Sequence, residues 1–385
     1  MSSSTPFRLL KRLRGYALQI GNDLSWHKRM SSVTHRSLLA RVLEQTVLLV
    51  NNAICAEDYY HLGLAAENMS MASKRTFLGS FEKWRYFNLI NPPVYDVLAR
   101  DKALFHLLAH SADLPTPATL ATTAPGRKPY FGMAIERTED LRAFLLTPTA
   151  ENLFFKPADG SLGEGALSIG EFSATSNTWE LLPEKTAISL DELIDRLTVD
   201  GKLARALIQE RLRPHPAVAS ILPDVCPTVR FMTLLTNNGV EHLGAALRIG
   251  SGRGPTDNLA GGGLLAPIDL DTGNVLSAIS LARDIPEHVK AHPVTKAAIS
   301  ATRIPNWNEL KALVDRSALA FNFLPCIGWD IGITERGPVI IEINTRPRCI
   351  SVQSARPTGL LDTAFGAELS RISGFLDSGI RRPTK

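Results

Sequence analysis

The sequence predicts an α+β protein with a mainly helical N-terminal region and two β-containing subdomains. In the first 95 residues apolar residues fall at helical spacing, and no strand is followed by a glycine-rich loop and a helix, so we expect no dinucleotide-binding fold there. A short strand at 152–156 leads into a glycine-rich loop, and hairpins with alternating apolar residues follow at 228–249 and 328–344. We therefore expect three regions, with bounds of 1–95, 96–208 and 209–385.

Length and composition limit the classes of protein that this chain can form. With 385 residues, 44% of them hydrophobic, it can bury a large core in two or three lobes. A net charge of +4 is too small to indicate a nucleic-acid partner, and the composition predicts no particular oligomeric state. No apolar run approaches the roughly 20 residues that span a bilayer. Arg and Lys interrupt the first apolar stretch, so no signal peptide is predicted.

The four cysteines are scattered along the chain without a CxxC pair: Cys55, Cys226, Cys326 and Cys349. Such a pattern fits neither a disulfide framework nor a zinc ribbon. It indicates a reducing compartment, and we expect a cytoplasmic protein.

The N-terminal segment is strongly basic. Residues 1–41 hold eight Lys or Arg against one acid, Asp23. A basic amphipathic helix is predicted from apolar residues at helical spacing, namely Leu9, Leu10, Leu13, Tyr16, Ala17 and Ile20. This helix could lie on an anionic membrane, resemble an organelle transit peptide, or pack on the body of the protein with a solvated basic face. We favour the third interpretation, because a stripe at helical spacing is more often packed than free.

Helical spacing predicts further helices at 37–50, 56–71, 101–110, 189–207 and 307–320. The aromatic-rich segment 75–90 ends at Asn91-Pro92-Pro93, a natural boundary. The first hairpin turns about Asn237-Asn238-Gly239.

In the second hairpin, two apolar-alternating runs flank the turn at 334–337. With a three-residue loop, one face of the sheet is wholly apolar, with the pairs Ile333–Val339, Ile331–Ile341 and Trp329–Ile343. The same register sets Asp330 opposite Glu342, with Asn344 further along that face. A two-residue loop would pair Asp330 with Ile341 and spoil both faces, so we predict the three-residue loop.

The polar face of this hairpin is a candidate metal site. Two carboxylates directly opposite each other would lie roughly 5 Å apart and repel, and a divalent cation removes that repulsion. Asp330, Glu342 and Asn344 offer only oxygen ligands, which suit Mg²⁺ or Mn²⁺ and not zinc. The alternative is the solvated face of an ordinary amphipathic hairpin, and this pattern alone leaves both interpretations open.

The loop at 157–165 is a candidate phosphate-binding loop. It follows a strand that ends in Lys156, and its small residues are Gly160, Ser161, Gly163 and Gly165. Glycines let backbone N–H groups approach phosphate oxygens, Ser161 can donate a further hydrogen bond, and Lys156 adds a positive charge. The loop lacks the Walker A pattern, and its alternative is an ordinary turn.

Two arginines are candidates for phosphoryl-group stabilisation. Arg248 ends a strand and leads into the glycine-rich stretch 250–263, which contains Asn258. Arg230 lies on the partner strand, and whether it shares a face with Arg248 depends on the length of the loop at 237–239. For Arg230, a structural ion pair is the alternative.

Taken in order along the chain, these residues resemble the ATP-grasp superfamily over about residues 95–355. The resemblance is carried by Lys102, Lys156-Pro157 with its Gly/Ser loop, Gln209-Glu210-Arg211-Leu212, Arg248, Asp330 and Glu342-Ile343-Asn344. Segment 248–263, followed by GWDIGIT and EINTRP, resembles more narrowly the sugar-transfer-associated ATP-grasp group. The resemblance implies two α+β subdomains that grip ATP, preceded here by a helical region.

The resemblance also implies a role for each residue. Lys102 and Lys156 would contact the nucleotide phosphates under a flap formed by the glycine-rich loop, and Asn258 would belong to the nucleotide site. Gln209, Glu210, Arg211 and Leu212 would form the hinge at the adenine edge, with Glu210 near adenine or ribose. Arg248 would stabilise the phosphoryl transition state, and Asp330, Glu342 and Asn344 would hold Mg²⁺ at the β- and γ-phosphates.

Two features depart from the family pattern. A ribose-binding acid commonly follows the hinge, whereas Arg213-Pro214-His215-Pro216 stands there in this chain. Many members begin with a parallel α/β domain, whereas this N-terminus is mostly helical.

The expected function is that of an ATP- and Mg²⁺-dependent ligase. It would activate a small or peptide-like carboxylate as an acyl phosphate for attack by an amine or other nucleophile, in cell-surface glycan or peptide-like metabolite biosynthesis. One alternative is a phosphotransferase acting on a sugar or polyol hydroxyl. The other is a non-catalytic nucleotide-binding protein, against which the complete set of Lys156, Asp330, Glu342 and Asn344 argues.

Overall fold

The computed structural model describes residues 5–32, 34–123, 129, 131–160, 163–198, 205–252, 254–257, 262–281, 286–300, 302–354 and 356–377, with side chains from residue 14 to residue 374. The chain forms two compact units. Unit 1 comprises Met1–Ile90, Arg283–Glu287 and Arg346–Lys385, and unit 2 comprises Asn91–Ala282 and His288–Thr345. This grouping differs from the expected bounds, because the C-terminal segment Arg346–Lys385 belongs to the same unit as the N-terminal helices.

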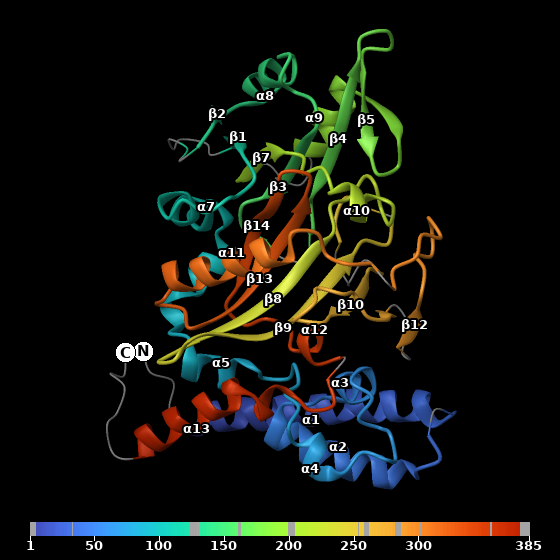
Figure 1. The fold of residues 1–385 in the computed structure, drawn as a ribbon, viewed down its shortest axis with the longest axis vertical. Coiled ribbons are helices and arrows are strands. Elements are labelled where there is room, and N and C mark those ends of the chain that lie inside the picture. Colours follow the sequence, from blue (N-terminus) through green and yellow to red (C-terminus); the bar gives the residue numbers. More distant parts are fainter. Residues whose placement is uncertain are drawn as a thin grey trace. The chain divides into compact units, whose positions relative to one another are not determined.

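Unit 1 is helical, as expected for the N-terminal region (Figure 1). Its helices are α1 (Thr5–Arg29), α2 (Leu38–Asn52), α3 (Ala56–His61), α4 (Met71–Lys74), α5 (Trp84–Ile90), α12 (Ile350–Gln353) and α13 (Ala364–Asp377), with 3₁₀ helices at Met30–Ser32 and Leu360–Asp362. The single helix expected at 56–71 is wrong. α3 ends early because Gly63, at φ 69°, supports a turn in which the N–H of Leu64 donates to the carbonyl of Tyr59 at 2.9 Å.

Helix α1 forms as predicted, but the predicted stripe is only partly buried. Tyr16 packs edge-on against Phe81, with ring centroids 5.0 Å apart, whereas Ile20 is 41% exposed. The buried residues of the helix include Asp23 and His27. The side chains of Leu9, Leu10 and Leu13 lie outside the described residues. Among the helices that the structure describes, none is both long and apolar enough to cross a membrane.

The C-terminal segment joins unit 1 through backbone contacts. The side chain of Gln353 accepts from the N–H of Leu78 at 3.0 Å and donates to its carbonyl at 2.8 Å. The N–H of Leu361 donates to the carbonyl of Thr76 at 2.8 Å. Helical spacing carries no information about such distant partners, which is why the sequence did not predict this packing.

Gly359→Ala is expected to destabilise this junction by about 1–3 kcal/mol, the usual cost of overpacking. A Cβ atom at Gly359 would lie 2.3 Å from the Cα of Phe77, although its φ of −84° suits alanine. Gly374→Ala is the control, because a Cβ there meets nothing within 4 Å and alanine favours the helix. Thermal melts should show a lower midpoint for the first variant only. Equal midpoints would contradict the close approach.

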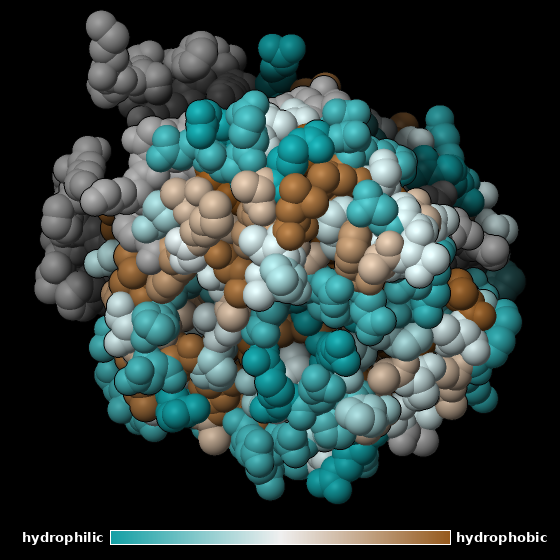
Figure 2. Space-filling view, turned by 90° about the horizontal axis from the view of Figure 1, so that it is seen from above, coloured by the Kyte–Doolittle hydropathy of each residue, from teal (hydrophilic) through white to brown (hydrophobic). Residues whose placement is uncertain are grey.

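Unit 2 begins with a 3₁₀ helix at Pro93–Asp96 and helices α6 (Val97–Arg100) and α7 (Lys102–Ser111), followed by the first sheet. That seven-stranded sheet has, in spatial order, β2 (Met133–Ile135), β1 (Thr119–Thr123), β7 (Ala206–Glu210), β3 (Leu153–Pro157), β4 (Leu167–Ser173), β5 (Thr178–Leu182) and β6 (Thr186–Ser189). Helices α8 (Thr138–Leu145) and α9 (Leu190–Thr198) supply apolar side chains to its core. The helix expected at 189–207 is therefore wrong at its end, where β7 begins. Seen from above, hydrophobic residues form separate groups among hydrophilic ones (Figure 2).

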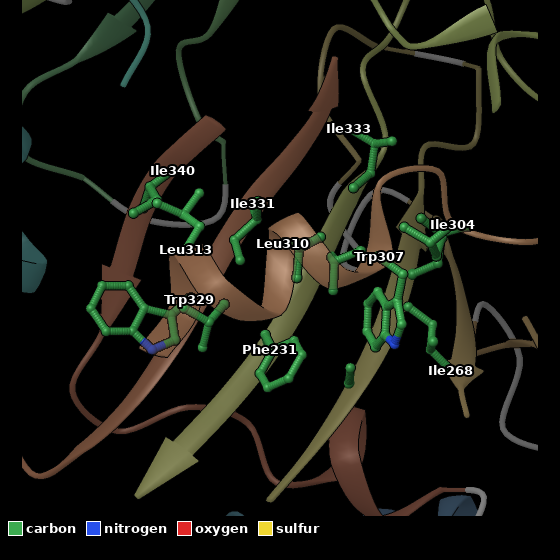
Figure 3. Packing of buried hydrophobic residues seen from close by; sticks show 14 of the residues in the cluster. Phe231, Ile268, Ile304, Trp307, Leu310, Leu313, Trp329, Ile331, Ile333 and Ile340 are labelled. Atoms are coloured by element: carbon green, nitrogen blue, oxygen red, sulfur yellow. The ribbon is translucent and has the colours of Figure 1, made fainter. Parts of the chain in front are cut away.

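The second sheet is also seven-stranded and confirms the expected α+β class. Its strands, in spatial order, are β12 (Glu287–Val289), β11 (Ala278–Ser280), β10 (Leu264–Ile268), β9 (Gly239–Ile249), β8 (Thr228–Thr236), β13 (Cys326–Thr334) and β14 (Gly337–Asn344). The short helix α10 (Pro216–Ala219) precedes it. Helix α11 (Trp307–Ala320), predicted with the same bounds, covers one face. Its Trp307, Leu310 and Leu313 lie against strand residues that include Phe231, Trp329 and Ile331 (Figure 3).

The β13–β14 hairpin confirms part of the predicted register. Asp330 pairs with Glu342, and Trp329 pairs with Ile343. The predicted three-residue loop is wrong. Thr334 pairs with Gly337, which leaves a two-residue turn, and β14 has a β-bulge just before Glu342. Because of the bulge, Ile331 pairs with Ile340 and Ile341 is the extra residue. Ile341 therefore leaves the apolar face and lies beside Gly332 on the other one.

Candidate functional site

The candidate site is centred on Asp330 in β13, which lies between β8 and the edge strand β14 of the second sheet. Arg230 of β8 is its direct partner on one side, and Glu342 of β14 is its partner on the other. Arg230 donates from Nε to Oδ1 of Asp330 and from Nη2 to Oδ2 at 2.8 Å, so the contact is bidentate. Asp330 is 2% exposed and Arg230 8%, which makes this a buried ion pair.

Arg248 of β9 lies on the same face as Arg230, which the sequence left open. Arg248 pairs with Thr228, two residues from Arg230 on β8, so the strand period places both arginines on one side. Its Nη1 donates to Oδ2 of Asp330 at 2.8 Å, and its Nη2 lies 3.0 Å from Oδ1 of Asp257. Asp257 also accepts hydrogen bonds from the side chain and the N–H of Thr228. Two arginines and two aspartates thus form one buried chain of charges.

The pKa values of the two facing carboxylates, Asp330 and Glu342, are shifted in opposite directions. Burial opposes ionisation of Asp330, but Arg230 and Arg248 outweigh it and hold the pKa of Asp330 below its ordinary value. Burial, together with the charge of Asp330, raises the pKa of Glu342. A cation placed between them would relieve the repulsion that the sequence predicted.

Two lysines of the first sheet region face Glu342. Lys156 lies next to the last residue of β3 and is 7% exposed, and Lys102 begins α7. The charges of both lysines lower the pKa of Glu342, against the larger effect of its burial. Burial lowers the pKa of Lys156 to about 8, although the charge of Glu342 opposes this. Lys156 and Glu342 are more than 180 positions apart in the sequence, and each shifts the pKa of the other. The fold therefore brings both charges to one site.

The glycine-rich loop lies close to Thr256, in the segment that follows β9. Gly160, Gly163 and Gly165 have φ values of 151°, 70° and 74°, which glycine adopts without strain. The carbonyl of Gly160 accepts from Nζ of Lys102 at 2.8 Å. A Cβ at Gly163 would lie 2.9 Å from Oγ1 of Thr256, so the loop approaches the stretch that carries Asp257. Ser161 and Asn258, both predicted at this site, lie outside the described residues.

Residues 82–367 match the sequence family described as sugar-transfer associated ATP-grasp. The chain belongs to this family. No curated protein matches the chain.

Solved structures with a similar fold include three ligases or carboxylases. D-alanyl-alanine synthetase A from Vibrio cholerae is 10% identical with a TM-score of 0.41, over 73% of this chain and 66% of that one. D-alanine–D-alanine ligase from Helicobacter pylori is 14% identical with a TM-score of 0.39, over 72% and 61%. Biotin carboxylase from Campylobacter jejuni is 12% identical with a TM-score of 0.39, over 75% and 48%. This ATP-grasp chain thus spans less than two thirds of each.

In this ATP-grasp chain, the predicted hinge residues lie at and just after the end of β7, and the side chains of three of them form hydrogen bonds. Gln209 donates to Oγ1 of Thr119 at 3.0 Å, and Glu210 accepts from Nη2 of Arg336 at 2.6 Å. Arg211 donates to Oδ1 of Asn152 at 3.0 Å. A cavity of about 270 Å³ lies beside them, lined by Leu120, Glu151, Asn152, 210–213 and 334–336. The contact of Glu210 with adenine or ribose stays a prediction.

The residues around Glu342 fit a hard divalent cation. Three hydrogen bonds from arginines occupy most of the lone pairs of Asp330, and a further side-chain interaction links Asp330 to Glu342. The buried Nδ2 of Asn344 has no hydrogen-bond partner in the described part of the chain, and rotation of the amide would place its oxygen there. The described residues of the chain contain no group of three His, Cys, Asp or Glu side chains that could hold a metal ion. The site therefore depends on two carboxylates and an amide, all oxygen donors.

Two residues near this site were not predicted. Asp257 pairs with Arg248, and the only sequence signal was an acid inside the glycine-rich stretch. His106 lies one turn after Lys102 on α7, 3.3 Å from the amide of Gln209, and burial lowers its pKa. Its spacing of four from Lys102 was the signal that could have found it.

Lys156→Ala is expected to weaken ATP binding tenfold or more at pH 7, about the effect of one charge-assisted contact. Since the pKa of Lys156 is about 8, the lysine is charged below that pH and must take up a proton to bind the nucleotide above it. ATP affinity should therefore fall as pH rises through 8. Lys156→Arg is the control, because its charge persists and the pH dependence should disappear. Calorimetry showing unchanged affinity for Lys156→Ala would remove this residue from the site.

Proposed function

We propose that this chain is an ATP- and Mg²⁺-dependent ligase that joins a carboxylate to an amine or other nucleophile. The observation that carries the proposal is the buried set of charges around Asp330, in which cations from both sheet regions face oxygen ligands. A site of this composition suits a polyphosphate and a divalent cation. The family description, which refers to sugar transfer, supports a substrate in cell-surface glycan or peptide-like metabolite biosynthesis.

In this proposal, the lysines and the glycine-rich loop bind the phosphates. Lys156 and Lys102 supply positive charge, and the backbone of the loop that contains Gly160 and Gly163 covers the nucleotide. Asp330, Glu342 and Asn344 would hold Mg²⁺. The bound metal would supply charge that offsets the β- and γ-phosphates.

Arg248, assisted by Arg230, would stabilise the reacting phosphoryl group. Its two contacts with carboxylates use two of the five N–H groups of the guanidinium, so others can donate to a phosphoryl oxygen. Asp257 and Asp330 hold the guanidinium in place, which reduces the reorganisation needed during the reaction.

The reaction has two steps. A substrate carboxylate oxygen attacks the γ-phosphorus, the bond to the bridging oxygen breaks, and ADP leaves. The nucleophile then attacks the carbonyl carbon of the acyl phosphate, loses a proton and releases inorganic phosphate. Closure of the loop would exclude water, which otherwise hydrolyses the acyl phosphate.

The test is to screen pairs of carboxylates and amines for release of ADP and phosphate. Substrate-dependent release of both in equal amounts, with a coupled product, supports the ligase. A phosphorylated sugar or polyol formed without free phosphate would instead identify a phosphotransferase. Hydroxylamine provides a direct check, since it traps acyl phosphates as hydroxamates and would trap nothing from a phosphorylated alcohol.

A further inference from the structure

The outward face of α2 is apolar. Leu39, Leu43, Val47 and Val50 recur at intervals of three or four residues and are 68%, 60%, 37% and 49% exposed. We call these four residues the outer stripe. Residues at this spacing share one side of a helix, so the stripe forms a continuous apolar strip along α2.

The neighbouring helix α1 also exposes apolar residues. Its Leu18, Ile20 and Leu24 are 63%, 41% and 38% exposed. The two helices lie side by side and antiparallel: Arg41 of α2 donates to the carbonyl of His27 at 2.8 Å, and Gln45 donates to Asp23 at 2.9 Å. With Leu38, which is 39% exposed, eight large exposed apolar residues of the described chain belong to this helix pair.

The inner face of the same pair is mixed, with polar residues beside the buried Leu48 and Leu49 of α2. Asp23, His27, Arg41 and Gln45 are each buried. Asp23 accepts from Gln45, from Gln19 and from the N–H of Ala56, all at 2.9 Å. A helix of a water-soluble protein normally turns its apolar side inward. On α2 four apolar residues instead face outward, which indicates that an apolar phase covers the outer stripe.

Charge identifies the covering phase. Among the residues of α1 whose side chains the structure describes, the exposed charged ones are Arg14, Lys28 and Arg29, whereas Asp23 is buried. On α2, Arg41 is buried and Glu44 is bound by Lys74 at 2.7 Å. Within the described part of α1 and α2, the exposed charged side chains are therefore all positive. The combination of apolar and positively charged residues matches an anionic bilayer, and it opposes a second copy of the chain, because identical faces would bring like charges together.

We infer that the α1–α2 pair binds the surface of an anionic lipid bilayer. The outer stripe would enter the boundary between headgroups and acyl chains, and the basic residues of α1 would contact anionic headgroups. This surface belongs to unit 1 and is independent of the proposed ligase activity.

The test measures binding of the full chain to vesicles of phosphatidylcholine with and without 30% phosphatidylglycerol. Binding should require the anionic lipid and weaken as salt is raised. Arg14→Gln and Lys28→Gln should each weaken binding roughly fivefold. Leu39→Ser/Leu43→Ser should weaken it about tenfold or more, since both side chains would otherwise leave water. Leu319→Ser on α11 is the control, because Leu319 is 56% exposed outside this surface, and binding should not change.

Three results would overturn the inference. The first is an absence of binding by the unmodified chain to anionic vesicles. The second is equal binding by Leu39→Ser/Leu43→Ser and the unmodified chain. The third is a dimer in solution that the same double variant converts to a monomer, which would assign the surface to self-association. Circular dichroism confirms that the variants are folded, and the charge variants test the surface separately from the apolar ones.

Discussion

Asp330→Ala is expected to lower the free energy of unfolding by about 3–5 kcal/mol, the usual cost of removing one partner from a buried ion pair. The variant leaves two arginines without their shared carboxylate: Arg230, which is 8% exposed, and Arg248, whose side chain is 12% exposed. Denaturant unfolding without nucleotide measures the change. Turnover of ATP should be lost as well, so stability and activity fall together.

Asp315→Ala is the matched control for this prediction. Asp315 also forms an ion pair, 2.7 Å from Nε2 of His242, but its side chain is 44% exposed. Loss of an exposed pair costs about 0–1 kcal/mol. If both variants unfolded at the same denaturant concentration, the charges around Asp330 would contribute no more than surface ones.

Glu342→Gln is expected to reduce ATP turnover by roughly 10³-fold or more, the scale of losing a metal ligand at the reacting phosphates. Its stability should stay the same or rise slightly. Burial and the charge of Asp330 raise the pKa of Glu342, so folding disfavours the ionised form and the glutamate costs stability as pH rises above its unfolded pKa. Glutamine is neutral at every pH and removes that cost. Thermal melts and ADP release measure the two effects separately.

Asn344→Ala should show the same loss of turnover without a loss of stability. Glu309→Gln, on the exposed side of α11, is the control and should turn over ATP normally. Wild-type turnover by Glu342→Gln in the presence of Mg²⁺ would show that the metal site is assigned to the wrong residues.

The hairpin at 328–344 shows how far the sequence predicts the site. Alternation of apolar residues was enough to pair Asp330 with Glu342. It could not choose between a three-residue loop and a two-residue turn with a bulge, because both use the same number of residues and give the same pairing. The sequence also could not predict that Arg230 and Arg248 lie on the same face of the sheet, because this depends on the exact pairing of β8 with β9.

Unit 1 shows where the sequence misleads. The apolar residues of α1 follow helical spacing, and this normally marks the core side. The buried side carries Tyr16 of this stripe, but also hydrogen-bonded polar residues such as Asp23, whose partners come from α2 and from Ala56. A stripe reports which residues share a side, but only tertiary contacts decide whether that side faces the interior.

The bulge at Ile341 also affects how relatives of this chain should be compared. Deletion of Ile341 would leave the turn at 335–336 unchanged and still set Asp330 opposite Glu342, because the bulged residue has no partner on β13. An insertion of one residue at the hairpin tip would likewise be compatible with the same pairing, through a longer loop. Sequence alignments should therefore tolerate a gap of one position between the hairpin tip and Glu342. A relative with one residue more or fewer in this segment can still place the counterparts of Asp330 and Glu342 opposite each other.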